Sequence, residues 1–456
     1  MKVKGVVAIL VIMLTGIASG TPGVLEEYVE EGLANNLALK QMDFSLERSR
    51  AALSEARGRF LPSVGINARY SRAGGGRTFE FPVGDMVNPI HDALNGLIGE
   101  PQFPTDVPNV NTPLLREEEH ETKLEVVQPI FQPAIYFNYK IYSHLTSAQE
   151  AARDVFRQDL ALEIKTAYYN YLKACELVKL AEKTEELLSE NLRVSRSLYE
   201  NDKATKDVVY RAEAELSEIE QQSAEARKGR TLARAYFNFL LNRPLDTEVE
   251  MEFPEGLPPE PEHDLAPMEE RALKRRYELR QLRSGIEAAR SSARLSRSAY
   301  LPGIVFAFDY GYEGEIYHFG EEDDFWMGSL VLQWDLFSGL QRRARINQAR
   351  AEEKKLKARL EELEQAVRLE IREAHENLAV AREAHEAADD RLESATRSFE
   401  MVNRKYREGM ARHIEFLDAR VAMTRAEVNL IVTTFDYHTR YSEYVRVVGL
   451  DTYGSE

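Results

Sequence analysis

Cysteine is nearly absent from this chain: Cys175 is the single one in 456 residues. A disulfide within the chain and a cysteine-based zinc or iron–sulfur site are therefore excluded. Basic residues are also scarce relative to acidic ones, and the net charge of −17 argues against nucleic acid as a partner. The sequence contains no nucleophile elbow, phosphate loop or metal-ligand cluster. We therefore expect no enzyme activity, no bound metal and no cofactor.

Long apolar runs are missing beyond the first residues. Lys2 and Lys4 precede an apolar run over 5–17, and Ala18-Ser19-Gly20 follows it. This pattern predicts a secretory signal peptide over 1–20, and a membrane anchor is the alternative. No later run reaches the roughly 18 residues that a helical span requires. The mature chain is thus expected outside the cytoplasm, either in solution or inserted through β-strands.

The chain contains an internal duplication. Phe60-Leu61-Pro62 matches Tyr300-Leu301-Pro302, and Tyr199-Glu200-Asn201-Asp202 matches Tyr406-Arg407-Glu408-Gly409. We predict a first repeat over 21–253, a proline-rich linker over 254–267, a second repeat over 268–450 and a tail over 451–456. The first repeat carries an insertion within 71–121, rich in glycine and proline. Because it joins two predicted strands, it is expected to be a loop, extracellular if the strands span a membrane; disorder is the alternative.

Each repeat contains two alternating segments typical of strands. Alternation follows Pro62 and Pro302, is clear over 329–336 and is weakest around Leu124 and Val126. The lengths suit tilted transmembrane strands as well as a soluble antiparallel sheet. In the membrane interpretation, the lipid-facing side chains are Ile66, Tyr70, Phe306, Phe308, Leu332 and Trp334.

Two very long helices follow the strands. Proline and glycine are absent over 137–198 and 340–407, and apolar residues recur there at helical spacing. Short breaks at 200–205 and 408–412 lead into alanine-rich return helices, so each repeat ends in a helical hairpin that packs as a coiled coil. Four strands are too few to close a membrane barrel, which needs about eight. Strands in a membrane would therefore require several chains to share one barrel.

The ordered motifs resemble the TolC-type outer-membrane efflux proteins of Gram-negative bacteria. The resemblance is carried by Tyr406-Arg407-Glu408-Gly409, by Glu415-Phe416-Leu417-Asp418-Ala419-Arg420, by the first-half copies Tyr199-Glu200-Asn201-Asp202 and Asp207-Val208-Val209, and by Trp334-Asp335-Leu336-Phe337-Ser338-Gly339. It implies a mostly α-helical homotrimer in the outer membrane, with four strands per protomer in a shared 12-stranded β-barrel and a large periplasmic helical tunnel. It also implies a periplasmic adaptor and an inner-membrane pump of the RND, ABC or MFS type as partners, and outer-membrane lipid around the barrel.

The resemblance further implies a passive efflux or type I secretion duct, gated at an acidic periplasmic tip. The matching gate and selectivity positions are Glu415, Asp418, Tyr406, Arg412 and Asp207, and the hairpin ends expected to dock the adaptor hold Asn201, Asp202, Glu408 and Gly409. The chain departs from the family pattern at two positions. A latch arginine is expected near Ala411, but this chain has Arg412 instead. Asp202 replaces the glycine of the first turn. The alternative function is an exported soluble coiled-coil scaffold or adaptor. The exported cargo is not predicted.

Overall fold

The computed structural model describes residues 23–261 and 264–450. The predicted signal peptide, the tail over 451–456 and two linker residues lie outside this part of the chain. The described residues form two compact units. One comprises the residues up to 48, 147–285 and those from 356 onward, and the other comprises 49–146 and 286–355.

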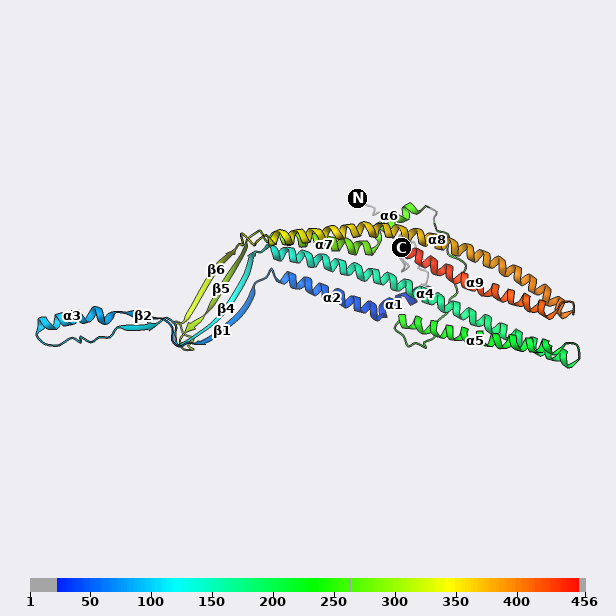
Figure 1. Ribbon diagram of the computed structural model, residues 1–456, viewed down its shortest axis with the longest axis horizontal. Helices are drawn as coiled ribbons and strands as arrows, with labels where there is room; N and C mark the ends of the chain where they lie inside the picture. The colour runs from blue at the N-terminus through cyan, green and yellow to red at the C-terminus, as the bar shows by residue number, and fades with distance from the viewer. Residues whose placement is uncertain (1–22, 262–263, 451–456) are drawn as a thin grey trace, which may run out of the picture. The chain divides into compact units, whose positions relative to one another are not determined.

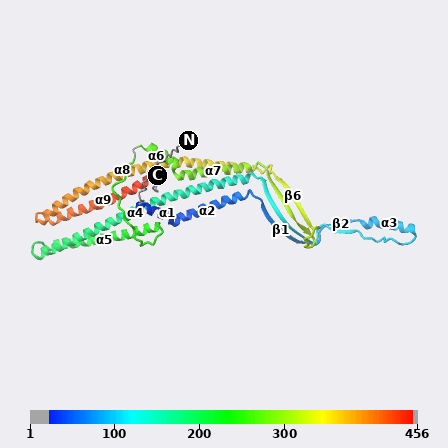
Figure 2. The ribbon, with the colours of Figure 1, turned by 180° about the vertical axis from the view of Figure 1, so that it is seen from behind.

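Two long helices and their return helices are present where the sequence predicts them (Figure 1; Figure 2). Helix α4 (Pro133–Glu200) has 68 residues and α8 (Gln341–Arg407) has 67. The return helices α5 (Lys206–Leu240) and α9 (His413–Val447) have 35 residues each. The predicted breaks therefore lie at the observed hairpin turns, because the polar and glycine-containing segments interrupt the helical pattern there.

The duplication is visible in the elements that precede the strands. Helices α1 (Val24–Asn35) and α2 (Leu37–Gly58) correspond to α6 (Leu265–Arg275) and α7 (Tyr277–Ser298). Where the sequence predicts one helix per repeat, a single extended residue divides it, Asn36 in the first repeat and Arg276 in the second. The Asn36 side chain accepts hydrogen bonds from the N–H groups of Ala38 (2.9 Å) and Leu39 (3.1 Å). It therefore caps α2, which explains the interruption.

Four antiparallel strands form the main sheet in the order β1 (Ser63–Arg72), β4 (Glu118–Phe131), β5 (Gly303–Gly314), β6 (Asp324–Gln333). Strand β4, predicted as the weakest, is the longest, with 14 residues. Its polar positions carry Glu119, Glu121, Lys123 and Glu125, which dilute the apolar signal in the sequence. Because it lies between β1 and β5, β4 is hydrogen-bonded along both edges and does not depend on its own β-propensity.

The insertion has secondary structure of its own. Strands β2 (Thr78–Phe81) and β3 (Val110–Pro113) pair as a two-stranded ribbon, and α3 (Val83–Ile98) lies between them in sequence. The Asn88 side chain exchanges two hydrogen bonds of 2.9 Å with the backbone of Val107, which ties α3 to the returning segment. Since β1 extends to Arg72 and β4 begins at Glu118, the segment between the two strands is 73–117.

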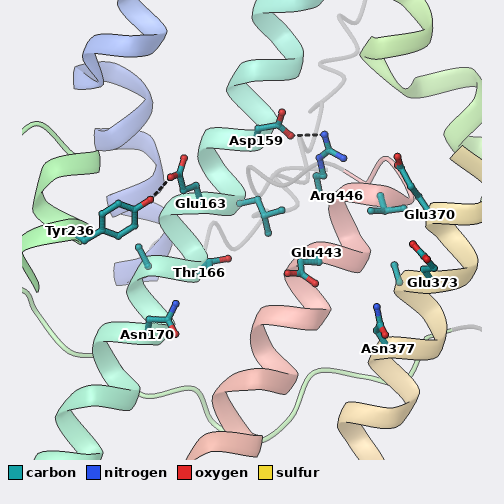
Figure 3. Close-up of a pocket in the computed structure, with 14 residues that line it drawn as sticks. Asp159, Glu163, Thr166, Asn170, Tyr236, Glu370, Glu373, Asn377, Glu443 and Arg446 are labelled. Atoms are coloured by element: carbon teal, nitrogen blue, oxygen red, sulfur yellow. Dashed lines mark hydrogen bonds and ion pairs between the residues drawn. The ribbon is translucent and has the colours of Figure 1, made fainter. Parts of the chain in front are cut away.

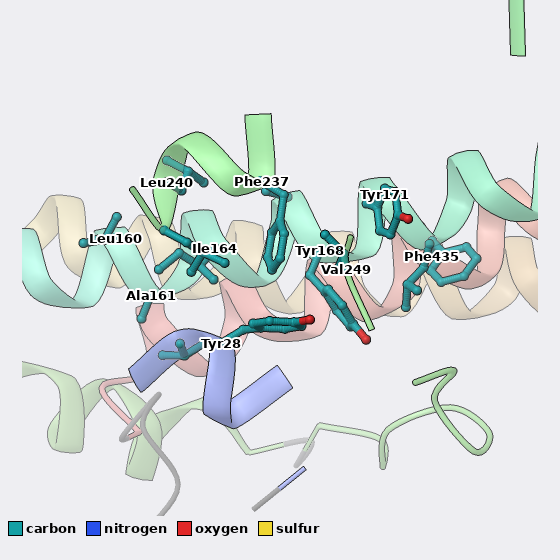
Figure 4. Close-up of a cluster of buried hydrophobic side chains, with 14 of the residues drawn as sticks. Tyr28, Leu160, Ala161, Ile164, Tyr168, Tyr171, Phe237, Leu240, Val249 and Phe435 are labelled. Carbon is teal, nitrogen blue, oxygen red and sulfur yellow. The ribbon is translucent and has the colours of Figure 1, made fainter. Parts of the chain in front are cut away.

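Aromatic residues form the largest core cluster, which packs α4 against α1 and α5 (Figure 4). The Tyr28 ring meets the Phe237 ring edge to face, with 5.1 Å between centroids. The Tyr168 hydroxyl accepts a hydrogen bond of 2.8 Å from the N–H of Glu252, so the chain after α5 is fixed to the same core. A second cluster packs α8 and α9 against α6 through Met268, Ile371, Leu378 and Tyr437. Each repeat thus has a core centred on its own elements, and Phe435 of α9 joins the first of the two clusters.

Candidate functional site

One face of the main sheet is apolar and exposed. The register aligns Ile66 with Leu124, Tyr310 and Trp326, and it aligns Val126 with Phe308. Ile66 is 74% exposed, Leu332 59% and Phe306 39%, whereas Phe308 is half-buried. Large apolar side chains exposed side by side over four strands form a patch of the kind that marks a membrane or protein interface.

The opposite face of the sheet is polar and charged. The Lys123 ammonium lies 3.1 Å from the Glu121 carboxylate and 3.4 Å from that of Asp309. The Asn67 amide donates to Glu125 at 2.7 Å. Because side chains alternate along each strand, this separation into two faces extends over the sheet. It is the arrangement required of a sheet with lipid on one side and water on the other.

The structure corrects one predicted strand residue. Trp334, predicted as part of a strand over 329–336, lies beyond β6, which ends at Gln333. Its indole N–H donates to the carbonyl oxygen of Tyr300 at 3.0 Å, and the side chain is 53% exposed. The chain leaves the sheet here because it must turn into α8 through Gly339 and Leu340, which both have positive φ. Trp334 therefore belongs to the strand-to-helix junction.

The first hairpin turns at Asp202, which has a φ of 57°. The N–H of Asp202 donates to the carbonyl of Tyr199 (3.0 Å), and the N–H of Lys203 donates to that of Leu198 (2.8 Å). These two bonds satisfy carbonyls that the end of α4 leaves unpaired. At the start of α5, a hydrogen bond from Thr205 lowers the pKa of the Asp207 carboxyl.

The second hairpin turns in the same way at Gly409, which has a φ of 75°. The N–H of Gly409 donates to the carbonyl of Tyr406 (3.0 Å), and the N–H of Met410 donates to that of Lys405 (2.8 Å). The Arg412 guanidinium donates to the Glu415 carboxylate at 2.9 Å. This bond lowers the pKa of Glu415 and keeps its carboxylate charged.

Aromatic side chains hold the second hairpin end together. The Tyr406 ring stacks on Phe416 with 4.9 Å between centroids, and Phe416 also contacts Phe399. The Tyr406 hydroxyl lies 3.0 Å from Nδ1 of His413. Burial raises the pKa of Tyr406 and lowers that of His413. The neutral forms of both rings are thus favoured near neutral pH, and in these forms the hydroxyl can donate to the ring nitrogen.

Charges of the first hairpin act on the second. Beyond burial, the positive charge of Arg211 lowers the pKa of His413, and the negative charge of Asp207 opposes it. Further along the two return helices, burial raises the pKa of Glu215 in α5, and the negative charge of Asp418 in α9 adds to this shift. Asp418 is exposed and lies one helical turn from Glu415. The predicted gate residues Asp207 and Asp418 therefore each act electrostatically on a side chain of the other hairpin.

Arg420 joins the two hairpins in the protein interior. Its side chain is 4% exposed and donates to the Thr184 hydroxyl of α4 at 3.0 Å. The Glu427 carboxylate lies 3.9 Å away and the Phe399 ring 5.5 Å away. Burial lowers the pKa of the guanidinium, which nevertheless stays charged. The sequence motif contains Arg420, but its position on an amphipathic helix gave no sign of burial.

A cavity of about 490 Å³ lies between α4, α8 and α9 (Figure 3). The carboxylates of Asp159, Glu163, Glu370, Glu373 and Glu443 line it. Arg446 donates to Asp159 at 2.5 Å, and Tyr236 donates to Glu163. Within residues 23–261 and 264–450, no cluster of histidine, cysteine or acidic side chains has the arrangement needed to hold a metal ion. No helix in those ranges is both long and apolar enough to cross a membrane.

Solved structures with the same fold are outer-membrane channels. The Campylobacter jejuni CmeC outer membrane channel aligns with a TM-score of 0.76 at 16% identity, over 94% of this chain and 86% of that one. The Vibrio cholerae outer membrane protein VceC gives 0.76 at 14%, over 93% and 96%. The open state of the Neisseria gonorrhoeae MtrE outer membrane channel gives 0.74 at 16%, over 93% and 89%. This chain therefore has the same fold as these outer-membrane channels.

A family match covers the second repeat. Residues 269–449 match the model of the outer membrane efflux protein family. A search of curated protein sequences found no match. The predicted family and fold class are confirmed, as are the predicted class of function, an outer-membrane efflux channel, and its outer-membrane location. The predicted roles of individual site residues stay predictions.

Proposed function

We propose that the chain is the exit duct of a tripartite efflux or type I secretion system and works as a homotrimer. The exposed apolar face of the sheet, set in register against a charged face, carries this proposal. Strands β1 and β6 are the sheet edges, each paired on one side only. In lipid an unpaired strand edge is too costly to persist. The edges are therefore covered by further copies of the same sheet.

The topology suits closure by three copies. The four strands are antiparallel to their neighbours, so β6 of one protomer and β1 of the next also run antiparallel when placed side by side. Three copies supply 12 strands, above the minimum of about eight for a membrane barrel. The charged face of the sheet then lines the pore, and the apolar face contacts lipid. The insertion over 73–117 continues from the extracellular end of β1 and β4.

A soluble coiled-coil scaffold is the competing function. It would need Phe306, Leu332 and Trp334 packed beneath its own helices. All three are exposed, by 39%, 59% and 53% respectively. An apolar surface of this extent is not stable in water without a partner. The exposure of these side chains therefore supports insertion in a membrane.

The hairpin ends are proposed to meet the partner proteins. Asn201, Asp202, Glu408 and Gly409 are exposed at the two turns, which leaves them accessible to a periplasmic adaptor. Energy is supplied by an inner-membrane pump of the RND, ABC or MFS type, while transport through this component is passive and involves no catalysis. Glu415 and Asp418, present in three copies, form an acidic ring that favours cations at the tip.

Ion selectivity in planar bilayers tests the acidic tip. The double variant Glu415→Gln with Asp418→Asn should shift the zero-current potential in a salt gradient toward lower cation preference. Glu220→Gln with Glu225→Gln removes two exposed charges from α5 and is the matched control. An unchanged potential in the tip variant, with single-channel conductance retained, would remove the acidic ring from the proposal. Absence of any channel activity in the parent would contradict the proposed duct itself.

A further inference from the structure

The segments that join helices to strands are strongly basic in an otherwise acidic chain. Four segments, 56–62, 132–140, 294–302 and 334–345, make these connections. They contain one acidic residue, Asp335, and eight basic residues: Arg57, Arg59, Lys140, Arg294, Arg297, Arg342, Arg343 and Arg345. The opposite end of the sheet is acidic, with Glu315, Glu321, Glu322 and Asp323 in the turn between β5 and β6. The two ends of one sheet thus have opposite charge.

The five basic residues from the second repeat divide into two sets. Arg342 and Arg345 line a cavity of about 670 Å³ whose walls include Val305 and Val331 from the charged face of the sheet. Arg342 is 8% exposed and lies 3.8 Å from the Asp335 carboxylate. Arg294, Arg297 and Arg343 do not line this cavity and are exposed. Within the ranges that the structure describes, these three arginines have no carboxylate partner.

Exposed aromatic side chains occur in the same connecting segments as the basic residues, and the Arg342 guanidinium lies over the Tyr300 ring at 5.4 Å from its centroid. Tyr300 is 49% exposed, Trp334 53% and Phe337 80%, and all lie in the same connecting segments. On the α2 side, the Arg57 guanidinium lies over the Tyr139 ring at 5.6 Å from its centroid. Aromatic rings next to cations are typical of the boundary between acyl chains and headgroups in a bilayer. Here they continue directly from the exposed apolar face of β5 and β6.

We propose that the junction set, defined as Arg294, Arg297 and Arg343, binds the phosphates of anionic glycerophospholipids in the membrane leaflet on the helix side of the sheet. This inference rests on the proposed membrane insertion. Guanidinium groups pair with phosphate oxygens, and these three have no acidic neighbour that would neutralise them. Each basic side chain near an anionic leaflet changes partitioning by about fivefold. The set therefore selects anionic over zwitterionic lipid and fixes the depth of the barrel.

Fluorescence of Trp334 gives a local measurement. The chain has two tryptophans, so Trp326→Phe leaves Trp334 as the single reporter, located in the basic junction. The trimer is reconstituted in bilayers that mix phosphatidylcholine with phosphatidylglycerol, one of the two carrying brominated acyl chains. Quenching by each brominated lipid gives the relative affinity of the junction for the anionic lipid. We expect the parent to prefer phosphatidylglycerol at least about fivefold at low salt, and less at high salt.

The variant Arg294→Gln, Arg297→Gln, Arg343→Gln should reduce this preference to near unity. The matched control Arg227→Gln, Lys228→Gln, Arg230→Gln removes three exposed charges from α5 and should keep it. Equal quenching by both lipids in the parent, or the same preference in the junction variant, would overturn the inference while leaving the duct intact. Absence of quenching by either brominated lipid would show that Trp334 is not at a bilayer, and the proposed membrane insertion would fail with it.

Discussion

The two hairpin ends have the same backbone and different side chains. Asp202 and Gly409 occupy equivalent left-handed positions and are flanked by matching hydrogen bonds of 3.0 and 2.8 Å. The first end packs a small aliphatic cluster of Leu192, Val209 and Ala212. The second packs Phe399, Phe416 and Leu417 with Tyr406 against them. Duplication has thus kept the turn geometry, while aromatic packing is concentrated in the second repeat.

The turn and the aromatic cluster have different functions at a hairpin end. The shared turn satisfies the last carbonyls of a long helix and needs only a residue that tolerates positive φ. The aromatic cluster adds a contact between α8 and α9 that can break without unfolding either helix. We therefore expect changes at the second end to alter gating, and equivalent changes at the first end to have smaller effects.

Removal of the central aromatic ring is expected to cause the largest loss of stability. Phe416→Ala should destabilise the second hairpin end by about 3–4 kcal/mol, because it leaves a cavity between Phe399 and Tyr406. At the first end, Val209→Ala removes a smaller side chain and should cost about 1–2 kcal/mol. Hydrogen exchange of the amides in each turn measures both values. Equal losses of stability at the two hairpin ends would contradict the proposed difference in their packing.

Opposite substitutions at the two turn residues should change the stability of the turns by smaller amounts. Gly409→Ala places a Cβ at a φ of 75° and should cost about 1–2 kcal/mol. Asp202→Gly relieves the same strain at the first end and should stabilise that turn by up to about 1 kcal/mol. Protease susceptibility of each turn, measured in the intact trimer, reports the two changes. Stabilisation of the second turn by alanine would show that its backbone is not as described.

Loss of a single hydroxyl has a still smaller effect. Tyr406→Phe keeps the ring stacked on Phe416 but removes the hydrogen bond to His413, worth about 1 kcal/mol net. Channels of this variant should open more often in planar bilayers. The first-repeat counterpart Tyr199→Phe serves as control and should leave the open probability unchanged. A closed-state lifetime equal to that of the parent would remove Tyr406 from the latch.

The pH dependence is the mildest prediction. The pKa of His413 in the folded protein lies below its ordinary value of 6.5, first because of burial and then because of Arg211. The unfolded chain therefore binds a proton before the folded one does as the pH falls below about 6.5, and the hairpin end loses stability there. Asp207 opposes the effect and Tyr406 is uncharged in this range. The protection factors of the amides in this turn, which correct for the intrinsic pH dependence of exchange, should fall toward pH 5, and His413→Gln should abolish this fall.

Much of the architecture could be predicted because it follows from local patterns. The long helices, their breaks and the duplication appear in the sequence as missing prolines and repeated motifs. Strand β4 is harder to predict from the sequence, since its stability comes from the neighbouring strands on both sides and not from its own residues. The end of β6 was placed three residues too far along because Trp334 continues the alternation while the backbone has already left the sheet.

The candidate site was predictable in part. Tyr406, Glu415 and Asp418 could be proposed from their motif, but their partners could not. His413 has no recognisable spacing relative to Tyr406, and its hydrogen bond forms only when the turn brings α9 back along α8. Arg420 is likewise polar in sequence and buried in the fold, because the other hairpin covers it. Contacts between hairpins depend on the packing of helices far apart in the chain.

Cross-linking of the sheet edges tests the shared barrel most directly. A chain with Cys175→Ser, Asn67→Cys in β1 and Ser329→Cys in β6 places one thiol on the charged face at each edge. In membranes, a flexible bis-maleimide should convert this chain into covalent dimers and closed trimers on denaturing gels, while either single-cysteine chain stays monomeric. A product that remains monomeric at full thiol modification would contradict a sheet completed by copies of itself.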